Sequence, residues 1–215
     1  MRICRAFGLV KEFTPGNVGL IAQAGIYAVG YLWGLRKVID FGIIATIGNK
    51  LDINETDMLE TMGNDNNIKV ICMYIEDIRC GRKFLEVAKD VSRKKPIIVL
   101  KSGRTDEGRK AILSHTASLA GRDEIYDAAF RQAGIIRAKD DEHMFALARA
   151  FSKQPLPKSD GVFVITYTGF FGVAAADAIS LNNMMLAEPA ARIITTLCER
   201  AKPHGSYIRA ELSAG

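Results

Sequence analysis

The chain has 215 residues, of which 48% are hydrophobic and 25% are charged. This length accommodates one large domain, or a domain with a smaller second unit, and the composition is that of a soluble globular protein with a buried core. The net charge of +5 is spread along the chain, and no basic run carries interleaved aromatic residues, so a nucleic-acid partner is not expected.

The cysteines and the longest uncharged stretch restrict the cellular setting. The four cysteines are far apart, form no CxxC pair and predict neither a disulfide framework nor a zinc site; they are Cys4, Cys72, Cys80 and Cys198. The stretch from Phe13 to Leu35 carries no charge, but its proline, asparagine, glutamine and five glycines argue against a membrane span. A reduced, cytoplasmic location is expected.

Short apolar runs alternate with segments of helical periodicity in the first part of the chain. In order, the patterns predict a strand at Val18–Ala22, a helix at Gly25–Leu35, a strand at Phe41–Gly48, a helix at Glu55–Met62, a strand at Val70–Glu76, a helix through Phe84 and Val91, a strand at Pro96–Ser102, a helix at Asp123–Gln132 capped by Gly134, a short strand at 135–138 and a helix at Asp140–Phe151. This alternation indicates a doubly wound parallel α/β sheet, in which ligands bind beyond the carboxyl ends of the strands.

A second, smaller unit is predicted after a proline-containing linker at Ser152–Gly161. The patterns there indicate a strand at 162–168, a helix at Phe171–Leu181, a strand at Met184–Ala187 and a helix at Pro189–Ala201. We therefore divide the chain into residues 1–152 and 153–215. Two strands rarely form a stable sheet, so the second unit is expected to be partial or to need a partner.

Two strand–turn–helix segments have the geometry of anion sites. Each would point a helix N-terminus, with its unpaired N–H groups, away from a strand end; they are GLIAQAGIYAVG and VITYTGFFGVAAADA. Many α/β proteins carry such turns for packing alone, so this alternative remains open.

His115 lies between Ser114 and Thr116 in the segment KSGRTDEGRKAILSHTASLAG, which follows a predicted strand. The small residues after it leave room for a ligand to approach the ring. A neutral imidazole nitrogen is a nucleophile when a partner fixes its tautomer. The alternative is a loop histidine that is hydrogen-bonded to one of its two neighbours.

Glu76 is the candidate partner of His115, because it closes the preceding predicted strand and its carboxylate would lie at the same sheet edge. The alternative is a solvated carboxylate paired with Arg79 or Arg82. His143 and His204 form no metal-ligand constellation with His115, so no metal site is predicted. The chain has no GxxxxGK[ST] or GxGxxG loop, so it is not expected to bind ATP alone.

Five segments in order, GNVGLIAQAG, IGNKLDINETDMLE, MYIEDIRCGRKFLEVA, KPIIVLKSGRTDEGRKAILSHTASLAG and DAAFRQAGIIR, resemble the succinyl-CoA-synthetase-like flavodoxin domain of ADP-forming acyl-CoA synthetases. The resemblance covers Gly16 to Phe151, and SHTASLAG is its most specific element. The later segment GVFVITYTGFFGVAAADA resembles the next ligase-CoA domain of these enzymes. The implied fold is flavodoxin-like, followed by part of a second α/β domain.

The resemblance implies that His115 is transiently phosphorylated and that Glu76 orients it. Acyl-CoA and phosphate would give an acyl phosphate and CoA, and the phosphoryl group would pass through the histidine to ADP. The implied phosphate-binding residues are Gln23, Ala24, Gly25, Ile26, Ser114, Gly169 and Gly172. The implied cofactors are CoA, phosphate and ADP or ATP with Mg²⁺, bound mainly by other CoA-binding and ATP-grasp domains or subunits in an oligomer.

Three departures from the family pattern bear on this expectation. Ala22 and Ala24 stand where the family turn has serines, which keeps the backbone donors but removes two hydroxyls. Tyr167, Phe170 and Phe171 crowd the second turn. No CoA-binding domain precedes Gly16 and no ATP-grasp region follows, so this chain alone is not expected to complete the reaction. A non-catalytic module that binds a partner or senses acyl-CoA is the alternative function.

Overall fold

The computed structural model describes residues 16–28, 30, 39–116, 121–155, 157–166 and 168–200. The chain divides into two compact units, Met1–Pro155 and Leu156–Gly215. The predicted division between residues 152 and 153 falls close to this boundary. Each unit is described by itself below.

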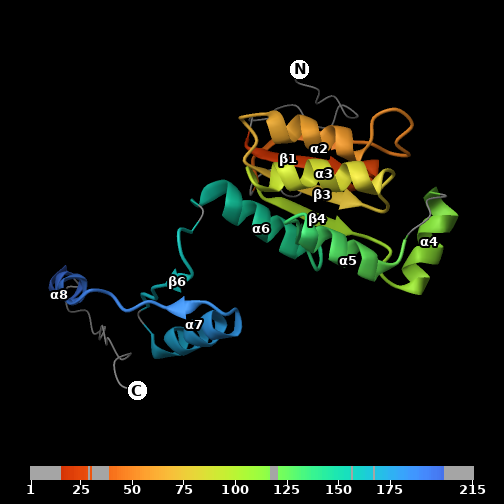
Figure 1. Cartoon of the computed structure of the whole chain (residues 1–215). Coiled ribbons are helices and arrows are strands. Elements are labelled where there is room, and N and C mark those ends of the chain that lie inside the picture. The colour runs from red at the N-terminus through yellow and green to blue at the C-terminus, as the bar shows by residue number, and fades with distance from the viewer. Residues whose placement is uncertain are drawn as a thin grey trace. The chain divides into compact units, whose positions relative to one another are not determined.

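The first unit contains a five-stranded sheet in which every pairing is parallel, with the strand order β2-β1-β3-β4-β5 (Figure 1). This order is that of the flavodoxin-like doubly wound fold, so the predicted fold class is confirmed. The strands are β1 (Val18–Ala22), β2 (Phe41–Thr46), β3 (Val70–Ile75), β4 (Ile97–Lys101) and β5 (Ile136–Arg137), and the helices are α2 (Glu55–Asn64), α3 (Gly81–Ser92), α4 (Asp106–Thr116), α5 (Asp123–Gln132) and α6 (Asp141–Lys153).

Both faces of this sheet are covered, which explains why its strands are apolar throughout. In β3, Ile71, Met73 and Ile75 contribute to one core and Val70 and Cys72 to the other, as the two-residue period of a strand requires. The first core is completed by apolar residues of α2, α3 and α5, and the second by α6 and the helical residues 25–28. Figure 1 shows α2 and α3 on the same side of the sheet.

Local chemistry fixes the start and the packing of α2. Asn54 is its N-cap: the Asn54 side chain accepts from the backbone N–H groups of Thr56 and Asp57, and the Asp57 side chain accepts from the Asn54 N–H in return. Near its end, a Cβ at Gly63 would lie 2.4 Å from Val91 Cγ2, so only glycine allows α2 and α3 to approach this closely.

The main error of the sequence prediction in this unit concerns α4, since the patterns predicted no helix between the strand at Pro96–Ser102 and the helix at Asp123–Gln132. Thr105 Oγ1 accepts from the Gly108 N–H, and the acidic Asp106 and Glu107 occupy the first helical turn, where the helix dipole favours negative charge. Gly134 has φ +68° just after α5, as its predicted capping role requires. Of the helix predicted at Gly25–Leu35, residues 25–28 and 30 are helical, and the rest lies outside the described residues.

The second unit has a two-stranded parallel sheet of β6 (Gly161–Val162) and β7 (Met185–Leu186), with helices α7 (Gly169–Leu181) and α8 (Ala191–Arg200). The strand predicted at 162–168 overlaps β6 only at Val162, so its predicted length is wrong. β7 offers only two residues for pairing, so Phe163 and Ile165 remain exposed without a ladder. Within the described residues, no helix combines the length and apolar character needed to cross a bilayer.

Candidate functional site at the carboxyl edge of the sheet

The register of the sheet places the residues that follow β1, β3 and β4 next to one another. Ala22 pairs with Tyr74, and Ile75 pairs with Lys101. The Gln23 N–H donates to the Tyr74 carbonyl at 2.9 Å, and the Ser102 N–H donates to the Ile75 carbonyl at 3.0 Å. Gln23 and Glu76 therefore lie at one edge, where ligands bind in this class of sheet.

Glu76 is 6% exposed, which contradicts the alternative of a solvated strand-end carboxylate. Its Oε2 has no hydrogen-bond partner among the described residues. Buried carboxylate oxygens are almost always hydrogen-bonded, because losing hydration without a replacement costs free energy. The carboxylate of Glu76 thus has an oxygen that can accept from a further donor.

Gln23 holds the backbone at Glu76. Its Oε1 accepts the N–H groups of Glu76 at 2.8 Å and Asp77 at 3.3 Å, and its Nε2 donates to Asp77 Oδ1 at 2.8 Å. Since the Gln23 N–H donates to the Tyr74 carbonyl, only the second Nε2 hydrogen is without an acceptor among the described residues. The predicted phosphate-binding role of Gln23 depends on that one hydrogen.

The hydrogen bonds of Arg79 go to groups other than the Glu76 carboxylate. Its N–H donates to Glu55 Oε1 at 2.8 Å, and its guanidinium donates to the carbonyl of Lys50. Glu55 and Lys50 form a buried ion pair, 2.9 Å between Lys50 Nζ and Glu55 Oε2. Lys50 Nζ also contacts Asp77 Oδ1 at 2.6 Å, which connects this ion pair to the residue that follows Glu76 in the chain.

Lys101 lies at the end of β4 and is almost fully buried. Its Nζ lies 4.5 Å from the centre of the Tyr126 ring, a cation–π contact, and donates to the carbonyl of Ser102. Burial lowers the pKa of Lys101 to about 8, because the charged form loses hydration. Burial likewise raises the pKa of Tyr74.

The helix that follows β1 starts at this edge. Tyr27 stacks on Tyr74 with ring centres 4.1 Å apart, and its hydroxyl donates to Asp141 Oδ1 at 2.9 Å, which fixes the first turn against β3 and α6. Gly25 is exposed, and a Cβ there would meet nothing within 4 Å. The N-terminal turn that contains Ala24, Gly25 and Ile26 is therefore accessible to a small anion.

His115 lies in the last turn of α4, not in a loop. The position of its side chain is outside the described part of the structure, so the predicted contact with Glu76 stays a prediction. Ser114 is exposed, and its hydroxyl donates to the Ala111 carbonyl at 2.8 Å. His143 belongs to the cap of α6: its N–H donates to Asp140 Oδ1, and its Nδ1 accepts from the Lys139 N–H. His204 is not among the described residues.

The predicted second turn belongs to the second unit. Thr168 Oγ1 accepts the Phe171 N–H at 3.4 Å and the Thr168 carbonyl accepts the Gly172 N–H at 3.3 Å, so the cap of α7 uses two of the donors at this helix start. Phe170 and Phe171 are exposed rather than packed over Gly169. Gly169 is open, since a Cβ there would meet nothing within 4 Å.

No sequence pattern predicted the ionic contacts beside Glu76, in which Lys50 pairs with Glu55 and Asp77. Charged residues usually lie on the surface, and no periodic pattern marks a pair that meets across 27 positions of the chain.

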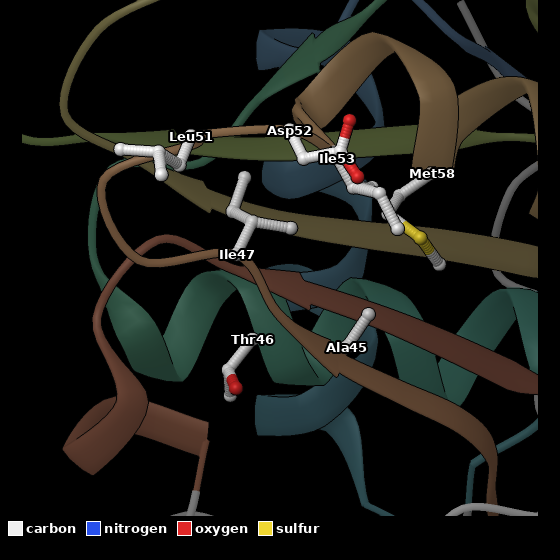
Figure 2. A pocket seen from close by; sticks show the side chains of 7 residues that line it. All are labelled: Ala45, Thr46, Ile47, Leu51, Asp52, Ile53 and Met58. Atoms are coloured by element: carbon white, nitrogen blue, oxygen red, sulfur yellow. The ribbon is translucent and has the colours of Figure 1, made fainter.

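A hollow of about 290 Å³ lies at the loop after β2 (Figure 2), lined by Ala45, Thr46, Ile47, Leu51, Asp52, Ile53 and Met58. Among the described residues, no group of three acidic, histidine or cysteine side chains could hold a metal ion.

Comparisons with known proteins cover most of the chain. Residues 15–151 match the family model described as succinyl-CoA ligase like flavodoxin domain. The chain is 41% identical over 197 residues to the acetate–CoA ligase [ADP-forming] I subunit alpha of Pyrococcus furiosus, covering 91% of this chain and 42% of that relative. It is 46% identical over 180 residues to the acetate–CoA ligase [ADP-forming] of Methanocaldococcus jannaschii, covering 82% of this chain and 25% of that relative.

A solved structure is also similar. It is a dinucleotide-forming acetyl-coenzyme A synthetase 1 from Ca. Korarchaeum cryptofilum in complex with phosphate and ADP, with a TM-score of 0.82 and 37% sequence identity over 92% of this chain and 43% of that one. The chain thus spans less than half the length of each of these proteins.

Proposed function

Because the chain belongs to the family of succinyl-CoA-ligase-like flavodoxin domains, we propose that it is the phosphohistidine-bearing part of an ADP-forming acyl-CoA synthetase. The overall reaction converts acyl-CoA, ADP and phosphate into the free acid, ATP and CoA. Support comes from relatives that are named ADP-forming acetate–CoA ligases and are 41% and 46% identical to this chain.

The observation that carries the proposal is the buried carboxylate of Glu76 at the carboxyl edge of the sheet. Its unpaired Oε2 needs a donor, and an imidazole N–H supplies one. A carboxylate that accepts from one ring nitrogen of His115 fixes the tautomer and leaves the other nitrogen as the nucleophile. The same contact stabilises the positive charge that the ring acquires on phosphorylation.

The proposed chemistry is two successive phosphoryl transfers through His115. Phosphate first attacks the acyl-CoA carbonyl and displaces CoA as its thiol, which gives an acyl phosphate. The free nitrogen of His115 then attacks phosphorus, the bond from phosphorus to the acyl oxygen breaks, and the acid leaves as a carboxylate. In the second transfer, an ADP oxygen attacks the phosphohistidine, which restores the neutral ring and forms ATP.

Backbone donors stabilise the charge on the moving phosphoryl group. The proposed donors are the N–H groups at the helix start of Ala24, Gly25 and Ile26, together with Gln23 Nε2. The Ser114 hydroxyl is also proposed, and it would have to turn away from the Ala111 carbonyl to donate. Fixed dipoles of this kind need little reorganisation during the transfer. At the second turn, Gly169 is the better candidate, because the N–H of Gly172 is engaged within the helix cap.

The proposal includes partners, because the chain spans less than half the length of the relatives compared. CoA-binding and ATP-grasp domains or subunits would bind CoA and ADP with Mg²⁺, in a cytoplasmic oligomer. The second unit, from residue 153, is proposed to be part of a ligase-CoA domain.

The test is ATP formation by the full-length protein together with its partner domains. Acetyl-CoA, ADP, Mg²⁺ and phosphate are supplied, and wild type is compared with His115→Asn and with His143→Asn as the matched control. We expect His115→Asn to lose ATP formation while His143→Asn retains it. Normal turnover by His115→Asn would refute the proposal and favour a non-catalytic module.

A further inference from the structure

A continuous series of buried and partly buried polar contacts connects the loop after β2 to the backbone of Glu76. Lys50 Nζ donates to Asp77 Oδ1 at 2.6 Å, the same oxygen accepts from Gln23 Nε2 at 2.8 Å, and Gln23 Oε1 accepts the Glu76 N–H at 2.8 Å. We propose that Lys50, Asp77 and Gln23 are positioning residues that set the orientation of the Glu76 carboxylate. This inference rests on the proposed role of Glu76 as the partner of His115.

The orientation of the Gln23 amide follows from the chemistry of Asp77. An ionised carboxylate only accepts hydrogen bonds, so it selects the Nε2 end of the amide. The Oε1 end must then face the N–H groups of Glu76 and Asp77. With the amide reversed, Oε1 would face the Asp77 carboxylate and Nε2 would face two backbone N–H groups, so no hydrogen bond would form at either end. The observed orientation forms hydrogen bonds at both ends.

Lys50 anchors the far end of the series. Its ammonium donates to Asp77 Oδ1 at 2.6 Å and to the Asp77 carbonyl at 2.7 Å, and it forms an ion pair with Glu55 Oε2 at 2.9 Å. Its backbone has φ +57°, a conformation unusual for a residue with a side chain. Such a conformation persists where surrounding contacts hold it, and the contacts of the Lys50 ammonium hold it here.

None of these three side chains needs to contact the substrate in order to act. Gln23 binds the backbone at Glu76, so its loss would free the peptide that carries the carboxylate. A displacement of about 1 Å in a reacting arrangement lowers a rate about 100-fold. The predicted signature is a fall in the rate constant of phosphoryl transfer to His115 that exceeds the change in the KM for phosphate, to which one Nε2 hydrogen of Gln23 contributes.

The experiment measures His115 phosphorylation by the full-length protein with its partner domains, from acetyl-CoA and phosphate. Gln23→Met removes both ends of the amide at similar volume, and Gln132→Met is the matched control at an exposed position. We expect the rate constant of Gln23→Met to fall about 10- to 100-fold and that of Gln132→Met to stay at the wild-type value.

Gln23→Glu gives a second, pH-dependent readout that loss of folding would not produce. The new carboxyl keeps an acceptor for the Glu76 N–H but faces the carboxylate of Asp77, with Lys50 as the nearby cation. When protonated, it regains a donor toward Asp77. We therefore expect its rate, relative to wild type, to rise as the pH is lowered from about 8 to about 5, through the titration range of a carboxyl group that faces another carboxylate.

Amide hydrogen exchange tests the contact directly. In Gln23→Met the Glu76 N–H should exchange faster, while the Ser102 N–H, which donates to Ile75, keeps its wild-type protection. Wild-type rates in both Gln23 variants, or unchanged protection at Glu76, would overturn the positioning inference and leave the proposed function intact. Absence of any phosphohistidine in wild type would instead overturn the proposed function, and with it this inference.

Discussion

Lys50 Nζ lies 2.9 Å from Glu55 Oε2, and both side chains are buried. Removing one member of such a pair leaves the other charge without compensation, which costs about 3–5 kcal/mol. We expect Lys50→Met to lower the free energy of unfolding by this amount. Urea denaturation measures it, with Lys94→Met as the control, because Lys94 pairs with Asp90 only at the surface and should change stability by less than about 0.5 kcal/mol. Equal effects of the two substitutions would contradict the buried network.

Two leucines differ sharply in burial: Leu59 in α2 is 0% exposed, and Leu51, which lines the hollow of Figure 2, is 95% exposed. Leu59→Ala leaves a cavity beneath α2 and should lower the free energy of unfolding by about 2–5 kcal/mol. Leu51→Ala should change it by less than about 0.5 kcal/mol. Thermal or urea unfolding of the two variants checks the difference, and a large loss in Leu51→Ala would contradict the described loop.

The buried Lys101 predicts a specific dependence of stability on pH. Its pKa is about 8 in the folded chain against 10.5 for a solvated lysine side chain, so the unfolded chain binds more protons between these two pH values. The contribution of Lys101 to the free energy of unfolding should therefore rise with pH across this window, by at most about 1.4 kcal/mol per pH unit. Comparing urea denaturation of wild type and Lys101→Met at several pH values isolates the effect. A constant difference between the two proteins would refute it.

The two cysteines in the described part of the first unit should differ in reactivity. Burial raises the pKa of the Cys72 thiol to about 12, whereas Cys80 is exposed. Since the thiolate is the reactive form, a maleimide at neutral pH should label Cys80 and leave Cys72 unmodified until the protein unfolds. Peptide mapping after labelling distinguishes the two sites. Rapid labelling of Cys72 in the native protein would show that the core of the sheet opens readily.

The sequence predicted the sheet well, because apolar runs that are buried on both faces carry a strong local signal. Val18–Ala22 and Asp123–Gln132 were predicted with the bounds that the structure has. Glu76 could also be placed, since a carboxylate directly after an apolar run must lie at the carboxyl edge of a parallel sheet. Its burial agrees with that interpretation over the solvated alternative.

Other features have no local signature. The contacts of Lys50 with Asp77 depend on how two loops meet, which single-sequence patterns do not encode. The helix α4 was missed because Gly108 and its polar residues weaken the apolar period, while the capping Thr105 is an easily overlooked signal. The apolar run after Gly161 predicted a longer strand than β6, because β7 offers only two residues for pairing.

The central claim is that His115 carries the phosphoryl group and that Glu76 supports it. The most direct measurement is acid-labile phosphate on residue 115, located by peptide mapping after brief incubation of the full-length protein and its partner domains with acetyl-CoA and labelled phosphate. We predict label on His115 in wild type and none in His115→Ala. In Glu76→Gln we predict that the rate of labelling falls by about 100-fold or more. Label at another residue, or wild-type phosphorylation in Glu76→Gln, would contradict the account.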